Sequence, residues 1–282
     1  MKRDTLAKLG LALMVMLIAV SMIVYPEPTF QAAERGLSIW WSIVLPALLP
    51  FFIAAEMLME LAYRLAVEET PFIRDIRNKV IVALTPVLEV DGRERVVDNF
   101  YFKKKTGQTL PLTWWGQYVA HDNNRDGYML NMIESRVMEH AWREWEPQII
   151  HVHHQTAPFP TRIWLPPFAE PIATRVPYVL SRQVNMIGMA MAKGLEERGQ
   201  VGATHMGTGF DAWYPGYIDY KPMLQNIASF WTETALFQYA TPRFYTPNDF
   251  PADMRDLRPQ SLYSSPWPGG WWRLRDAVEY ME

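Results

Sequence analysis

The chain has 282 residues, enough for one large domain or two, and its 49% hydrophobic content with 12 Trp supplies a sizeable core. The formal net charge is -3 and no long Lys/Arg tract is present, so nothing indicates a nucleic-acid partner. The absence of Cys excludes a disulfide framework and thiolate chemistry, and it leaves the redox compartment open.

The first apolar run extends from Leu9 to Tyr25 and follows three basic residues. With its flanking residues it reaches the roughly twenty residues that cross a bilayer as a helix. A basic start before an apolar centre is also typical of a signal peptide, but a Tyr-Pro-Glu-Pro sequence at 25–28 stands where a small-residue cleavage site would follow. We therefore favour an uncleaved membrane span.

A second uncharged stretch runs from Gly36 to Ala55 and is again long enough for a span. Trp40 and Trp41 suit a membrane interface, whereas Pro46 and Pro50 would kink or break a helix. A straight span and a re-entrant or broken helix both remain open. The sequence thus predicts membrane localisation with the bilayer as a partner, and the side on which the large domain lies depends on that alternative.

The segment 34–53, ERGLSIWWSIVLPALLPFFI, resembles the start of sporulation-type integral membrane proteins of the nucleoside-recognition (gate) class. The resemblance covers about the first fifth of the chain. We accordingly predict a membrane-associated segment at 1–59, with one or two transmembrane helices, and a separate domain at 60–282.

From residue 60 onward, apolar strands alternate with helical stretches. The predicted elements are an amphipathic helix at 60–69 ended by Thr70-Pro71, a strand at 79–85, a loop at 87–92 with the turn signal Asp91-Gly92, a helix at 131–145, a strand at 149–154, a helix at 183–198 stopped by Gly199, a strand at 201–205, and ordered loops after Thr241. This alternation predicts a layered α/β fold with a parallel or mixed sheet.

Half of the six histidines crowd the short strand Gln148–Gln155, as His151, His153 and His154. Open α/β sheets place their sites at strand ends, and imidazole is the commonest side-chain metal ligand. One reading is that at least one of these histidines binds zinc. The other is that they are hydrogen-bonded strand-end residues, since one strand supplies too few ligands for a zinc site.

Three further polar segments can carry chemistry. In His121–Gly127, an Arg beside Asn amides suits a carboxylate, although a surface turn with a salt-bridged Arg explains it equally. Glu233 lies among apolar residues, which would raise its pKa toward that of a general base; alternatively it is the first acid of a helix capped by Thr232. The basic run Lys103–Lys105 is usually a solvated face.

Together these segments resemble the zinc metallocarboxypeptidases of the carboxypeptidase A type, most closely the large bacterial members. The matching segments, in the same order and rough spacing, are 85–92 (TPVLEVDG), 121–126 (HDNNRD), 151–155 (HVHHQ) and 232–235 (TETA). The resemblance implies an α/β, mixed-sheet carboxypeptidase-like domain that is truncated at its N-terminus and preceded by hydrophobic membrane helices.

The resemblance also implies roles for individual residues. Asn124 and Arg125 would bind the terminal carboxylate of a peptide or protein substrate, and His154 would be a zinc ligand. Glu233 would be the general base acting on a zinc-bound water, and Lys104 is the nearest candidate for the cation that polarises the scissile carbonyl. The implied reaction is metal-assisted hydrolysis of a peptide bond with one zinc ion as cofactor.

The chain differs from the carboxypeptidase family in one respect, which leaves two alternative functions. The family takes two more zinc ligands from a His-x-x-Glu motif upstream, and this chain has no His before His121. Strand alternation directs His151 and His153 away from the face of His154, so we expect an incomplete zinc site. The chain is then either a membrane-tethered zinc carboxypeptidase or a catalytically inactive fusion that retains a pocket for peptide C-termini. A small transporter is disfavoured, because two short apolar segments cannot build the usual repeat pair.

Overall fold

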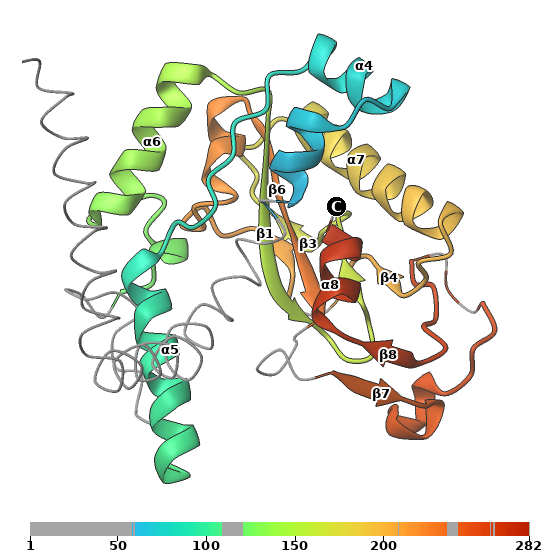
Figure 1. Ribbon diagram of the computed structural model, residues 1–282. Coiled ribbons are helices and arrows are strands. Elements are labelled where there is room, and N and C mark those ends of the chain that lie inside the picture. The colour runs from blue at the N-terminus through green and yellow to red at the C-terminus, as the bar shows by residue number, and fades with distance from the viewer. Residues whose placement is uncertain are drawn as a thin grey trace, which may run out of the picture. The chain divides into compact units, whose positions relative to one another are not determined.

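The computed structural model describes residues 58, 60–108, 121–207, 209–235, 242–259, 261 and 263–281 (Figure 1). The chain divides into two units, Met1–Pro50 and Phe51–Glu282, and every described residue belongs to the second. Both apolar runs of the sequence, 9–25 and 36–55, lie outside the described residues.

The predicted fold class, an α/β carboxypeptidase-like domain preceded by hydrophobic membrane helices, is corrected by the structure. None of the helices in the described ranges is both long and apolar enough to cross a bilayer. The helix α7 (Tyr178–Glu197) has 20 residues, but four of them are charged. What the described residues form is a mixture of helices and short sheets.

The main sheet has the strand order β1-β6-β2-β4 and combines both pairing directions. β6 runs parallel to β1 and antiparallel to β2, while β2 and β4 are parallel. The bounds are β1 (Ile149–Ala157), β6 (Ala228–Ala235), β2 (Ile163–Trp164) and β4 (Ala203–Thr204). All residues of β6 are buried, which fits its central position, although four of its eight residues are polar or charged.

The N-terminal part of the described chain is helical, and here the sequence prediction fails twice. Residues 60–67 are helical as predicted, followed by α4 (Pro71–Lys79), whose N-terminal amide at Ile73 is capped by the Thr70 hydroxyl. The predicted strand 79–85 is irregular, because no strand pairs with it among the described residues and Ile81 is 87% exposed.

The predicted loop 87–92 is also wrong, since α5 (Val90–Thr106) begins inside it. The Glu89 carboxylate accepts a hydrogen bond from the amide of Gly92 and so caps the helix. Asp91 then lies in the first turn, where a negative charge favours the helix dipole. Asp-Gly therefore marks a helix start here and not a turn between strands.

The two later helices confirm their predictions, with shifted ends. The helix expected at 131–145 is α6 (Ile133–Trp145), and the one expected at 183–198 is α7, which starts five residues earlier, after Pro177. Gly199 ends it with a positive φ of 78°. At Gly188, α7 lies against the carbonyl of Pro166 so closely that an added Cβ would be 1.9 Å from that oxygen.

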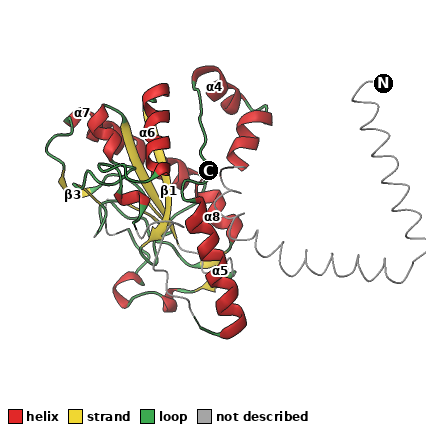
Figure 2. Ribbon diagram, turned by 90° about the vertical axis from the view of Figure 1, so that its left-hand side faces the viewer, coloured by secondary structure: helices red, strands yellow, loops and turns green. Residues whose placement is uncertain are grey.

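The largest core cluster lies between α7 and the central strands. Trp164 and Trp231 are its centre, with ring centroids 6.1 Å apart. In Figure 1, α7 and α6 lie on either side of the β1–β6 pair, and Figure 2 shows the strands at the centre with α7 and α8 (Leu274–Met281) on different sides. The connecting elements are β3 (Ala169–Ile172), paired in parallel with β5 (Asp211–Ala212), and the short helices η2 (Asn123–Arg125) and η3 (Lys221–Gln225).

The C-terminal segment, predicted as loops, contains regular structure. It holds an antiparallel pair and a terminal helix besides two 3-10 turns: β7 (Arg243–Tyr245), η5 (Pro247–Asp249), η6 (Ala252–Met254), β8 (Gly270–Trp272) and α8. These elements enclose the guanidinium of Arg162, which lies 4.0 Å from the ring centroid of Trp267 and 4.4 Å from that of Trp272.

Candidate functional site

The candidate site forms where β1 and β6 run side by side. Their parallel register places His154 directly opposite Glu233, and Val152 opposite Trp231. Directly paired residues of neighbouring strands share a face of the sheet, so the imidazole and the carboxylate lie on the same side. Glu233 is only 4% exposed and sits in the central strand, with Trp164 of β2 paired to its other side.

A carboxylate that the sequence analysis missed, Asp219, holds His154 in place. Its Oδ2 lies 2.7 Å from His154 Nε2. The amide nitrogen of Asn124 completes the group, 3.3 Å from the same Asp219 oxygen and 3.4 Å from His154 Nε2. The other oxygen of Asp219 is buried and forms no hydrogen bond with the described residues. The only sequence signal for Asp219 is the one that singled out Glu233, a lone carboxylate among aromatic residues.

The electrostatic surroundings favour the charged form of His154. Burial by itself lowers the pKa of this imidazole, but the hydrogen bond that Asp219 accepts from it and the negative charges of Asp219 and Glu233 outweigh burial, and the pKa is raised. The nearby positive charge of Arg125 opposes this rise. The site therefore combines a protonatable imidazole and a guanidinium with the two carboxylates of Asp219 and Glu233.

The Asn-Arg loop predicted from sequence is a capped 3-10 turn, η2. Asp122 caps it by accepting a hydrogen bond from the backbone amide of Asn124 at 2.8 Å. The side-chain oxygen of Asn124 accepts the amide of Ile218 at 3.2 Å, which anchors the turn beside Asp219. The structure thus brings Asn124, Arg125, His154 and Glu233 into one neighbourhood.

Arg125 itself is stacked and accessible. Its guanidinium carbon lies 4.7 Å from the centroid of the Tyr217 ring, and the side chain is 47% exposed. The nearest acid, Asp122, is 3.7 Å away, beyond hydrogen-bond distance. The reading of a salt-bridged surface turn therefore explains only part of this loop, since the guanidinium edge stays able to receive a carboxylate.

The other two strand histidines lie on the opposite face, as alternation predicts. His151 Nε2 is 3.0 Å from the hydroxyl of Thr232, and its ring stacks on Phe230 and contacts His153, with centroids 4.6 and 4.0 Å apart. Burial lowers the pKa of His151 well below its usual value and lowers that of His153 to about 4, in each case helped by a neighbouring histidine. Thr232 is a strand residue of β6 and not a helix cap.

Lys104 and His121, which the sequence suggested as possible site residues, do not contact the group around His154 within the described ranges. Lys104 is exposed in the last turn of α5, the helix that begins within the predicted loop 87–92. His121 lies with its Nε2 3.3 Å from Asp126, a buried carboxylate that accepts the amides of Asn131 and Met132. His121 therefore supports the loop and is not directed at His154.

The donor set does not fit a complete catalytic zinc site. Such a site needs three protein ligands besides water. Within the described ranges, no group of three or more His, Asp or Glu side chains is arranged to hold a metal ion. His154 has its Nε2 committed to Asp219, which would leave only Nδ1 for a metal.

Comparisons with known proteins concern a small part of the chain. No family model and no solved structure matches it. The chain is similar to the sporulation integral membrane protein YlbJ of Bacillus subtilis (strain 168), with 45% identity over 42 residues, which are 15% of this chain. These residues cover 10% of that relative. The predicted resemblance to sporulation membrane proteins is confirmed to this extent.

Proposed function

We propose that the domain from residue 60 onward binds the C-terminal end of peptides, as a relative of the zinc metallocarboxypeptidases with an incomplete metal site. The observation that carries this proposal is the grouping of Asn124, His154 and Asp219 within hydrogen-bond distances, with Arg125 next in the same turn. The peptide carboxylate would lie against Arg125, with Asn124 beside it.

The geometry of Arg125 supports a carboxylate ligand. Tyr217 covers one face of the guanidinium, so its edge, which carries the N–H donors, is the part left to a ligand. An arginine edge matches a carboxylate with two parallel hydrogen bonds. The pKa of His154 is raised by Asp219 and Glu233 in spite of burial, which favours the protonated imidazole in this group.

Replacing Arg125 by Gln should weaken the binding of a peptide with a free C-terminus about 10- to 100-fold, because a charge-assisted hydrogen bond contributes roughly 1.5–3 kcal/mol. Titration calorimetry with a peptide and its C-terminally amidated form measures this. The amidated peptide should bind the natural chain as weakly as the free peptide binds the variant.

Arg258→Gln is the matched control, because Arg258 is 85% exposed and already paired with Asp256. It should leave the affinity unchanged. Equal affinity of the free and the amidated peptide for the natural chain would refute the proposed site.

A second candidate, peptide hydrolysis at a zinc ion, is supported by one observation. His154 and the buried Glu233 are directly paired, and the family resemblance assigns them the roles of ligand and general base. The absence of further metal donors within the described residues stands against this candidate.

Metal content tests the second candidate directly. If it is right, the purified chain should hold nearly one zinc per molecule, and His154→Ala should remove it while the exposed His140→Ala does not. Glu233→Gln should then abolish hydrolysis and keep the metal. Protein that is free of metal after dialysis against zinc would end the hydrolase reading and leave peptide-end binding intact.

A further inference from the structure

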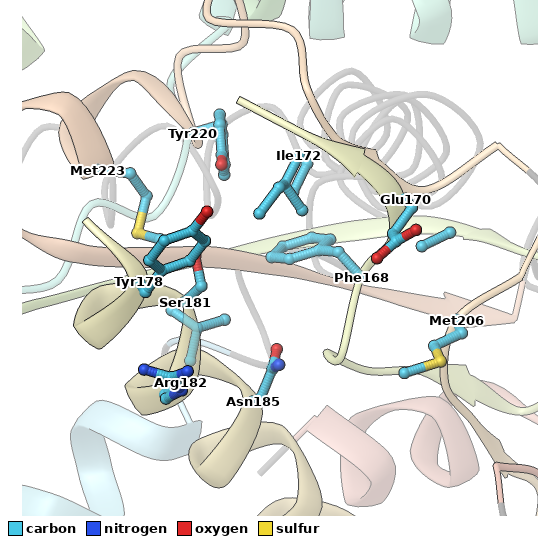
Figure 3. A pocket seen from close by; sticks show the side chains of 13 residues that line it. Phe168, Glu170, Ile172, Tyr178, Ser181, Arg182, Asn185, Met206, Tyr220 and Met223 are labelled. Atoms are coloured by element: carbon cyan, nitrogen blue, oxygen red, sulfur yellow. The ribbon is translucent and has the colours of Figure 1, made fainter. Parts of the chain in front are cut away.

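A pocket of about 550 Å³ opens between α7 and the β3–β5 pair (Figure 3). Its volume lies in the range of small-molecule sites. None of the residues that line it belongs to the group of Asn124, Arg125, His154, Asp219 and Glu233. The proposed function therefore does not explain the use of this pocket.

The floor of the pocket is apolar and well supported. Phe168 and Tyr220 line it and also contact Trp231, with ring centroids 4.3 and 6.4 Å from that of the tryptophan. Because these residues belong to or pack against the main core, the floor is part of the rigid interior. Ile172 and Met223 extend the same apolar surface.

Two opposite charges face each other across this floor. Glu170 comes from β3 and Arg182 from α7, and Figure 3 shows them on opposite sides of the pocket. Neither side chain forms a recorded ion pair with any described residue, and both are exposed at the mouth. Asn185 lies three residues after Arg182 on the same side of α7 and offers an amide beside the guanidinium.

We propose that this pocket binds a short apolar peptide with both ends free, of two or three residues. The peptide ammonium would contact Glu170, the peptide carboxylate would contact Arg182 and Asn185, and the side chains would cover the floor of Phe168 and Ile172. A ligand with two separated charged ends suits charges placed on opposite walls better than a single small ion does.

Titration calorimetry of the full chain with leucyl-leucine at low ionic strength tests this proposal. N-acetylation of the peptide and Glu170→Gln should each weaken binding about two- to fivefold, the effect expected for one exposed charge contact. Amidation of the C-terminus and Arg182→Gln should do the same. Arg175→Gln, an exposed arginine outside the pocket lining, should change nothing.

Combining each peptide modification with each variant tests which end of the peptide contacts which side chain. If Glu170 holds the ammonium, N-acetylation should cost nothing further in Glu170→Gln, and amidation should cost nothing further in Arg182→Gln. Additive losses would overturn the assignment of the ends.

Two other results would overturn the proposal. One is free leucine binding as tightly as the dipeptide, which would remove the requirement for two separated ends. The other is dipeptide binding that is abolished by Arg125→Gln but untouched by Arg182→Gln, which would move the peptide to the His154 site.

Discussion

Replacing Arg162 by Ala should lower the free energy of unfolding by about 4 kcal/mol, a large share of the 5–15 kcal/mol that stabilises a typical domain. Arg162 is 2% exposed, and its guanidinium lies against the indoles of both Trp267 and Trp272. Its Nε donates to the carbonyl of Pro160 at 3.0 Å, and no acid pairs with it in the described ranges.

The expected loss has two physical sources. A desolvated cation over an aromatic ring contributes up to about 2 kcal/mol per contact, and the aliphatic stem fills space that Ala would leave empty. Burial lowers the pKa of Arg162 to about 10, so the side chain still carries its charge at neutral pH. The contacts connect the start of β2 with the C-terminal strands and thereby hold the tail on the main sheet.

Urea denaturation followed by tryptophan fluorescence measures this effect. Arg162→Met keeps the stem and should recover about half of the loss, while Arg162→Lys keeps the charge but not the planar group that stacks on indoles. Arg275→Ala, at an exposed position of α8, is the control and should cost less than about 0.5 kcal/mol. A loss in Arg162→Ala no larger than in this control would show that the buried cation does not hold the tail.

The domain should also lose stability between pH 7 and pH 5 because of the histidines on the far face of β1. The pKa of His153 falls to about 4 in the folded chain through burial and the charge of His154, against an ordinary value of 6.5. The unfolded chain therefore takes up the proton first, and the folded state is disfavoured as the pH falls from 6.5 toward 4. His153 alone should account for about 2 kcal/mol over this interval.

His154 acts in the opposite direction, so the variants must separate the two. Its pKa is raised by Asp219 and Glu233, which outweigh burial. Its contribution is fully present below pH 6.5 and is lost as the pH rises through the folded-state pKa. The natural chain thus shows the sum of a loss and a gain between pH 7 and pH 5.

Unfolding free energies of the natural chain and of His153→Gln, measured at both pH values, isolate the far-face effect. The variant should lose about 2 kcal/mol less than the natural chain. The exposed His140→Gln should follow the natural chain. Identical pH dependence in all three proteins would mean that His153 is not buried in a neutral form.

Sequence alone could predict only those residues of the candidate site that stand out within a short segment of the chain. The turn with Asn124 and Arg125, the β1 histidines and Glu233 each stand out within a few residues of chain, and alternation along β1 correctly separated His154 from His151 and His153. Asp219 could not be found in this way, because it is 65 residues beyond His154 and only the fold brings the two within 2.7 Å. The role assigned to Lys104 assumed a loop at 87–92, but the helix α5 begins there.

The same distinction between local and long-range contacts applies to the helices and strands. Helical periodicity and capping signals were enough for α6 and α7, since these depend on contacts three or four residues apart. The β-branched run at 79–85 had the composition of a strand but no pairing partner among the described residues, and a strand exists only through its partner. The expectation of preceding membrane helices rested on apolar length and on the resemblance of 34–53 to sporulation-type membrane proteins. Both apolar runs lie outside the described residues, and no helix within the described ranges could span a membrane.

The sequence by itself located α6, α7 and the strand β1 and singled out Asn124, Arg125, His154 and Glu233, because each stands out within one or two turns of chain. Only the tertiary structure decided that Asp219 orients His154, that Arg162 lies against two indoles, and that Glu170 and Arg182 lie on opposite sides of an apolar floor. Those relations join residues far apart in sequence, and they exist only because burying the apolar surface of β6 and α7 draws the segments together.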